Sequence, residues 1–158
     1  MTVGVGLRLA AAVSLRIEHV MDGPGLSDWQ LVHNEIIPTD PLPLDVIRER
    51  AQRRRLTVAY DGDVPVGCAT VRPPEDDTPA ATLIVRVLPA HRRQGFGDQF
   101  YRAELPHALA LSDSVETIVL ESNQDGLRFA LSHGFVEIER YLLPGDTIPF
   151  ITLRSTDR

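Results

Sequence analysis

Residues 81–98 read ATLIVRVLPAHRRQGFGD, a β-rich run that leads through a basic turn with two glycines into a helical segment. At a helix start, up to four backbone N–H groups have no partner inside the helix, and the helix dipole adds positive potential. Gly95 and Gly97 let a ligand approach the backbone closely, while Arg92 and Arg93 add charge beside it. The stretch therefore predicts a backbone cradle for an anion, placed where a strand gives way to a helix.

Two better-known phosphate motifs do not fit this turn. A dinucleotide-binding fingerprint needs a third glycine at position 100, where the chain has Phe100. A P-loop needs Gly-Lys-Ser or Gly-Lys-Thr, which does not follow. Taken alone, the two glycines are explained equally well by a tight turn.

The composition is that of an ordinary globular protein of 158 residues, with 43% hydrophobic and 24% charged residues. We expect a single domain over 1–158, with 1–12 as a loose N-terminal leader, in the cytoplasm. A net charge of -6 argues against a nucleic-acid partner, and no apolar run approaches the roughly 18–20 residues of a membrane span. The single cysteine, Cys68, excludes an intrachain disulfide and a cysteine-based metal site, and its apolar surroundings favour an inert core thiol over a reactive one.

The hydrophobic period predicts the elements along the chain. Strands are expected at 13–20, 56–60, 65–72, 81–88, 115–121, 135–141 and 147–153, and helices at 26–37, 44–54, 95–111 and 124–132. Asp61-Gly62-Asp63 predicts a hairpin turn between two strands, and Pro106 is expected to kink its helix or end the regular part. The strands on either side of the glycine turn and its helix should be parallel and joined by a right-handed crossover.

The turn belongs to a longer pattern, Val-x-Pro-x-x-Arg-x-x-Gly-x-Gly, over Val87 to Gly97. Downstream, Glu121-Ser122-Asn123 precedes a short helix that ends before Gly134-Phe135. Together these segments resemble the acyl-coenzyme A signature and the second conserved segment of the GCN5-related N-acetyltransferases, the GNAT superfamily. The order of elements is similar to that of the family over residues 15–153.

The resemblance implies an α/β (α+β) fold. It consists of a mixed, mostly antiparallel sheet of about six or seven strands around a parallel β-α-β unit, with about four helices. It implies that acetyl-coenzyme A binds between the splayed parallel strands, with its pyrophosphate on the turn. The cofactor-binding residues are then expected to be Val85, Arg86, Val87, Arg92, Arg93, Gln94, Gly95, Phe96, Gly97, Asp98 and Asn123. Asn123 could equally be the N-cap of the following helix.

The resemblance implies no metal. The catalytic groups, however, depart from the family pattern. The tyrosine that often protonates the leaving thiolate is replaced by Ala130. Glu121 is the candidate general base, although a solvated carboxylate at a strand end is an equally good interpretation. Ser122, Tyr101, Tyr141 and His133 are fallback donors, each better explained as structural.

The resemblance implies an N-acetyltransferase that acts on a primary amine of a small molecule or peptide. The acceptor site is expected from Trp29, His33, Asn34 and Glu35, the loop 38–41 and the segment 141–148, although Trp29 on an apolar helix face is more typical of a core residue. The substitution at Ala130 motivates an alternative, a non-catalytic acyl-coenzyme A-binding sensor. A third alternative is an unrelated α/β protein with a fortuitous turn. A homodimer is a further expectation, because the closing strands of such domains often pair.

Overall fold

The computed structural model describes residues 15–75 and 77–156, so the leader predicted over 1–12 lies outside the described residues. In chain order the elements are β1 Arg16–Val20, α2 Pro24–Ile36, α3 Leu44–Arg53, β2 Arg55–Asp61, β3 Val64–Arg72, β4 Ala81–Val87, the 3-10 turn η1 Pro89–His91, α4 Phe96–Leu109, β5 Val115–Leu120, α5 Gln124–Ser132, β6 Phe135–Tyr141 and β7 Phe150–Ser155.

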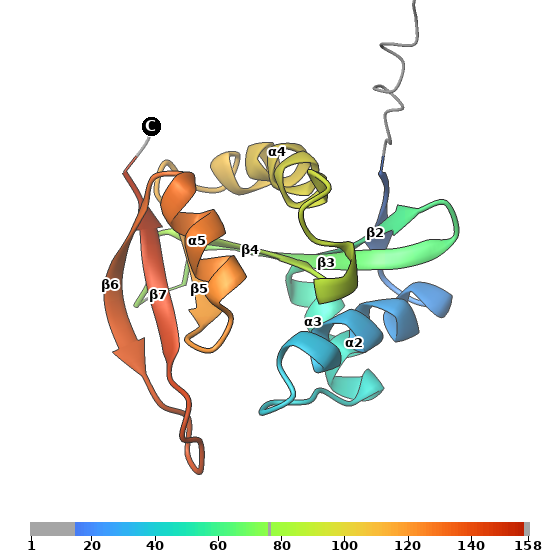
Figure 1. Cartoon of the computed structure of the whole chain (residues 1–158), viewed down its shortest axis with the longest axis horizontal. Helices are drawn as coiled ribbons and strands as arrows, with labels where there is room; N and C mark the ends of the chain where they lie inside the picture. Colours follow the sequence, from blue (N-terminus) through green and yellow to red (C-terminus); the bar gives the residue numbers. More distant parts are fainter. Residues whose placement is uncertain (1–14, 76, 157–158) are drawn as a thin grey trace, which may run out of the picture.

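The strands form one seven-stranded sheet in the order β1-β2-β3-β4-β5-β7-β6. Every neighbouring pair is antiparallel except β4 and β5, which are parallel and are joined through α4. Figure 1 shows α4 over one face of the sheet and α2 and α3 under the other, with α5 beside β5. The predicted mixed, mostly antiparallel fold with a central parallel unit is confirmed.

Strand alternation divides the core between the two faces of the sheet. Under α2 and α3 the buried cluster includes Trp29, Val32, Ile47, Leu56 and Val58. On the α4 and α5 face two further clusters include Val71, Leu83, Phe96, Phe100 and Leu153. Cys68 is fully buried on the first of these faces, where burial raises the pKa of its thiol to about 12. The prediction of an inert core thiol is therefore confirmed.

Two predicted features can be compared with the structure in detail. Pro106 lies inside α4, and the helix continues through it to Leu109, so of the two expected outcomes the end of the helix is excluded and the kink stays a prediction. The last strand begins at Phe150, three residues later than predicted, because residues 147 and 148 form a bend before Pro149. The carbonyl of Pro149 accepts a hydrogen bond of 2.9 Å from the amide of Glu121, which fixes this entry to the strand.

Within the described part of the chain, no helix is both long enough and apolar enough to cross a membrane. One of the two edge strands of the sheet is β6, where Val136 and Ile138 are exposed. The expected homodimer stays a prediction.

Candidate active site

The site begins where β4 and β5 separate. The two strands pair at Ala81 with Val115 and at Thr82 with Glu116, and the described residues show no further pairs between them. Both strands nevertheless continue for several residues, β4 to Val87. The rest of β4 therefore has no strand partner on this side, and it borders an open cleft of about 460 Å³.

The cradle predicted at the start of α4 has the expected local geometry. Gly95 is the N-cap in the left-handed conformation, with φ at 81°, and no side chain caps the helix. The first helical hydrogen bond runs from the amide of Gln99 to the carbonyl of Gly95 at 3.1 Å. Among the described residues, the amides of Phe96, Gly97 and Asp98 have no acceptor. Three convergent N–H donors at the positive end of a helix make an anion site.

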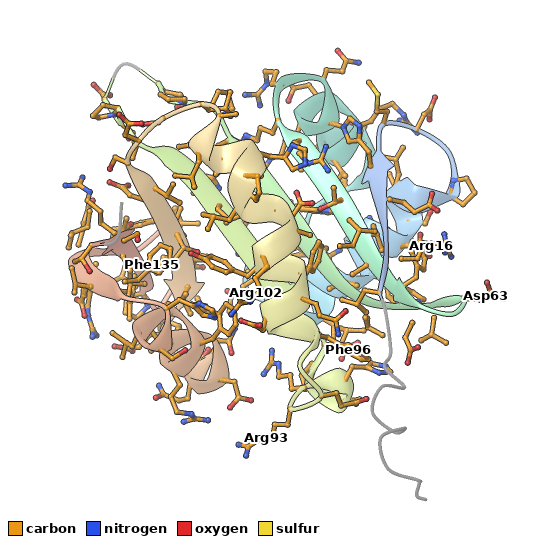
Figure 2. The ribbon with its side chains drawn as sticks, turned by 90° about the horizontal axis from the view of Figure 1, so that it is seen from above. Arg16, Asp63, Arg93, Phe96, Arg102 and Phe135 are labelled. Carbon is orange, nitrogen blue, oxygen red and sulfur yellow. The ribbon has the colours of Figure 1, made fainter. Side chains whose placement is uncertain are left out.

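The side chain of Arg92 holds the turn in place. Its Nε donates to the carbonyl of Val87 at 2.7 Å, and its Nη1 lies 3.1 Å from a carboxylate oxygen of Asp125 on α5. The hydrogen bond from Arg92 to Asp125 is the main reason why the pKa of Asp125 is lowered. Arg92 thus ties the end of β4 to α5. Arg93 adopts a positive φ of 65°, and Figure 2 shows its side chain pointing outward from the turn.

The cleft is lined by most of the predicted cofactor-binding residues, namely Val85, Arg86, Val87, Arg92, Arg93, Gly95, Gly97, Asp98 and Asn123. Gln94 and Phe96 do not line it. The Phe96 side chain is buried in the core, as Figure 2 shows, so only its backbone faces the site. The sequence reasoning missed the contribution of α5, whose residues Asp125, Gly126, Arg128, Phe129 and Ser132 form the opposite wall. Asp125 and Arg128, in the first turns of this helix next to Asn123, were the sequence features that could have indicated this wall of the cleft.

Both interpretations of Asn123 agree with the structure. Its Oδ1 accepts from the amide of Gly126 at 3.0 Å, so it caps α5. It also lines the cleft and a small cavity of about 30 Å³ between the diverging strands. A Cβ atom at Gly126 would lie 2.7 Å from Asn123 Nδ2, so glycine is what lets the cap fit this closely.

A second cavity, of about 260 Å³, lies on the opposite face of the sheet between β3, β4, α2 and α3. It brings together Trp29, His33, Asp40 and Tyr141 from the expected acceptor segments. Asn34 is instead engaged with the backbone of Leu42. Trp29 is almost fully buried and its indole N–H donates to the carbonyl of Ala69, so it is a core residue that also lines the cavity.

The family model described as the Acetyltransferase (GNAT) family matches residues 25–135. The chain belongs to this family. No curated protein matches the chain in sequence at a significant level. Among solved structures, the yncA protein of Salmonella typhimurium with its cofactor acetyl-CoA is 15% identical, with a TM-score of 0.70, and the match covers 89% of this chain and 92% of that one.

Two further structures of acetyltransferases resemble the chain. The ribosomal-protein-alanine N-acetyltransferase of Brucella melitensis has a TM-score of 0.71 at 16% identity, covering 89% of this chain and 98% of the other. An acetyltransferase of Thermus thermophilus has a TM-score of 0.64 at 19% identity, covering 90% and 97%. At these identities the likeness shows the shared fold. The family model makes the chain a GNAT acyltransferase.

In this GNAT chain, Arg86 lies between the cleft beside α4 and α5 and the cavity of about 260 Å³, which are called the coenzyme cleft and the acceptor cavity after the ligands proposed for them below. It lines both of them, as well as the small cavity between the strands. Alternation along β4 explains this position: Leu83 and Val85 face α4 and α5, whereas Ile84 and Arg86 belong to the acceptor side.

His33 and Tyr141 are both uncharged at neutral pH. Burial, aided by the nearby charge of Arg86, lowers the pKa of His33 to about 4. The ring also stacks on Trp29, with centroids 5.2 Å apart. Burial raises the pKa of Tyr141, whose hydroxyl is therefore protonated and able to donate. A neutral imidazole with a low pKa is a weak base.

Glu121 follows β5 directly, and its carboxylate forms an ion pair with Arg140 on β6. It lines none of the three cavities. To accept a proton, this carboxylate would have to give up its ion pair, and its catalytic role stays a prediction. Ala130 is 4% exposed and packs in the core with its neighbours on α5, β5 and β7.

The remaining fallback donors lie outside the acceptor cavity. Tyr101 lines the small cavity between the diverging strands and packs against His133 on the α4 and α5 face, with ring centroids 4.5 Å apart. His133 Nε2 also lies 3.4 Å from a carboxylate oxygen of Asp98, which links α5 to the first turn of α4. Ser122 is absent from the linings of all three cavities. In the described residues, no group of three or more His, Cys, Asp or Glu side chains could hold a metal ion.

Proposed function

We propose that this chain transfers the acetyl group of acetyl-coenzyme A to the primary amine of a small molecule or peptide. The observation that carries the proposal is that the two sites adjoin. The part of β4 without a partner borders the cleft at the start of α4, and its Arg86 lines both this cleft and the acceptor cavity on the other face of the sheet. The family to which the chain belongs uses this donor.

The residues of the cleft fit the parts of this donor. The amides of Phe96, Gly97 and Asp98 suit the pyrophosphate, because they are preorganised N–H donors at the positive end of a helix. The backbone of β4 beyond Thr82 suits the amide-containing arm, because it has no strand partner on that side. Gly97 leaves room for the ligand, since a Cβ there would have no protein atom closer than 3.4 Å.

The transfer forms a bond between the amine nitrogen and the acetyl carbon and breaks the bond from that carbon to sulfur. The amine must lose a proton to attack, and the leaving sulfur gains one as a thiol. Placing the two reactants in adjoining sites supplies much of the rate acceleration, so few catalytic side chains are needed. Tyr141, which is protonated and lines the acceptor cavity, is suited to donate a hydrogen bond or a proton there.

The test combines binding with turnover. Acetyl-coenzyme A at about 100 times its Kd should raise the stability by about 2.7 kcal/mol, which a thermal-shift assay detects. Free coenzyme A thiol should then appear when a suitable amine is added. The alternative, a non-catalytic sensor, rests on Ala130, and binding without turnover across a broad amine panel would establish it. Absence of binding would refute both functions.

Gly97→Val tests the cradle directly. The added methyl groups would intrude between the ligand and the amides, so we expect the affinity for acetyl-coenzyme A to fall by about 10- to 100-fold. Ala103→Val is the matched control, because it places the same side chain at an exposed position of the same helix. Isothermal titration calorimetry should show loss of affinity in the first variant and none in the second. Equal affinities would contradict the cradle assignment.

A further inference from the structure

Four arginines converge on the acceptor cavity. Arg50 lies in the last turn of α3 and Arg54 is the C-cap that follows this helix, while Arg72 ends β3 and Arg86 lies on the neighbouring strand β4. Thr70 also lines the cavity, as the same-face neighbour of Arg72 on β3. The cavity therefore has a cationic wall that comes from three elements.

These arginines differ from the others in their partners. Arg53, Arg55, Arg140 and Arg154 each form a salt bridge with a glutamate. By contrast, no ion pair or hydrogen bond to another described residue engages any of the four side chains of the cavity wall. The lining includes one carboxylate, Asp40, which lies within 4 Å of none of them.

Buried nitrogen atoms make the missing partners significant. The Nε atoms of Arg54 and Arg72 are shielded from solvent and have no acceptor in the described structure. A buried donor that lacks an acceptor is destabilising, so such groups are expected to find one. Burial and the neighbouring arginines lower the pKa of Arg54 to about 10 and also lower the pKa of Arg72. The carboxylate of Glu75 opposes this effect only from a distance.

A purely structural role does not account for this arrangement. Arginines that support a fold usually pair with carboxylates or carbonyl oxygens, as Arg55 does with buried Glu104. The whole chain carries a net charge of -6, so the cluster is not part of a generally basic surface. Cations gathered around a cavity, with donors still available, favour an anionic ligand inside it.

We propose that the amine accepted by this site carries an anionic group, a carboxylate or phosphonate, on the same small molecule, and that Arg54 and Arg72 hold this group. The inference rests on the proposed acetyl transfer and specifies its acceptor. Guanidinium groups match the oxygens of a carboxylate or phosphonate through forked hydrogen bonds. A cavity of about 260 Å³ suits a molecule of amino-acid size. Polycationic amines are repelled by the same wall.

The first experiment compares acceptors that differ only in the anionic group. The common α-amino acids are tested against their α-amides and decarboxylated amines, with aminoalkylphosphonates as a third arm. We expect kcat/KM to be at least about 10-fold higher for the carboxylates or phosphonates than for their neutral counterparts. The two anionic arms show which kind of oxyanion the site prefers. Equal or better use of the neutral amines would overturn the inference.

The second experiment changes the wall. Arg72→Met and Arg54→Met remove a charge while keeping an apolar stem, and Arg48→Met on the exposed side of α3 is the matched control. The KM for the anionic acceptor should rise about 10- to 100-fold in the first two variants, with affinity for acetyl-coenzyme A unchanged. The control should behave as the unsubstituted chain. An unchanged KM in both wall variants would refute the role of these arginines.

A binding measurement separates this inference from the proposed function. N-acetyl amino acids and their α-amides are titrated into the chain with coenzyme A present, so that no turnover is required. Tighter binding of the anionic members, lost in Arg72→Met and Arg54→Met, supports the anion site even if no amine is acetylated. If turnover occurs but the amides bind as tightly, the inference fails while the acetyl transfer stands.

Discussion

The phenol of Tyr141 stacks on Phe150 and lines the acceptor cavity, whereas the carboxylate of Glu121 is held by Arg140 outside it. We therefore expect Tyr141→Phe to lower kcat by about 100-fold, the lower range for a lost proton donor, with the affinity for acetyl-coenzyme A unchanged. Glu121→Gln should change kcat by less than about threefold, because its carboxylate is already engaged. Steady-state kinetics on both variants shows whether Tyr141 or Glu121 takes part in proton transfer. A large loss in Glu121→Gln alone would instead identify this carboxylate as the base.

His33 makes a prediction about pH and stability. Its pKa is about 4 in the folded chain, against an ordinary 6.5, so between these values the unfolded chain binds more protons. The free energy of unfolding should therefore fall as the pH drops from 6.5 towards 4, by at most about 3 kcal/mol from this residue. Urea unfolding at a series of pH values should show a shallower dependence in His33→Gln. The same slope in both proteins would contradict the assignment.

At the scale of elements, two glycines are used in opposite ways. Gly67 sits where β3 runs beside β4, and a Cβ there would lie 2.6 Å from the carbonyl oxygen of Arg86. A Cβ at Gly97 would meet only ordinary contacts, the nearest at 3.4 Å to Phe129. The first glycine therefore permits the strands to pair closely, and the second leaves space beside the helix start.

We expect Gly67→Ala to lower the free energy of unfolding by roughly 1–3 kcal/mol, because a strand backbone must shift to accept the methyl group. Gly97→Ala should leave the stability of the free chain unchanged or slightly raised, since alanine favours a helix. Urea unfolding of the two variants measures the difference. Equal effects would show that the close approach at Gly67 does not govern the pairing of β3 with β4.

The elements themselves could be predicted because each carries its own period and its own turn residues. The hairpin at Gly62 and the helix start at Gly95 are set locally, by residues that adopt positive φ. The place of β7 between β5 and β6 is a long-range pairing that no local pattern determines. The start of this strand was missed for the same reason, since Phe150 is defined by its pairing with Leu120.

The same division applies to the candidate site. The anion cradle at the start of α4 could be predicted because its backbone donors lie within one short segment that ends at Asp98. The cationic wall was not, because its members are spread over α3, β3 and β4 and meet only through the register of the sheet. The spacing of Arg50 and Arg54 by one helical turn was the only local signal. The sequence also could not show that the Arg92 guanidinium donates hydrogen bonds to the carbonyl of Val87 and the carboxylate of Asp125.

At the scale of the whole molecule, the two cavities lie on opposite faces of one sheet. The coenzyme cleft lies between α4 and α5, and the acceptor cavity lies toward α2 and α3. In the proposed transfer, the two reactants meet at the break in pairing between β4 and β5, where Arg86 lines both cavities. A continuous parallel ladder would close this break, so the incomplete pairing of these strands is a requirement of the proposed transfer.

The cationic wall should also make the free chain less stable than it could be. Arg72 is half-buried near other arginines, with a buried Nε that has no acceptor among the described residues. Replacing it by methionine removes repulsion and keeps the packing of the stem, so Arg72→Met should raise the free energy of unfolding by about 0.5–2 kcal/mol. Arg48→Met, at an exposed position, should leave it unchanged within about 0.5 kcal/mol.

Chemical denaturation of both variants, without ligand and then with a saturating anionic acceptor, completes the test. The acceptor should stabilise the unsubstituted chain and the Arg48→Met control, but should lose most of this effect on Arg72→Met, because a ligand stabilises only in proportion to its binding. A stability that rises without ligand while acceptor affinity falls means that the arginine serves the site at the expense of the fold. A loss of stability as large as that of a core truncation would mean that Arg72 serves the fold.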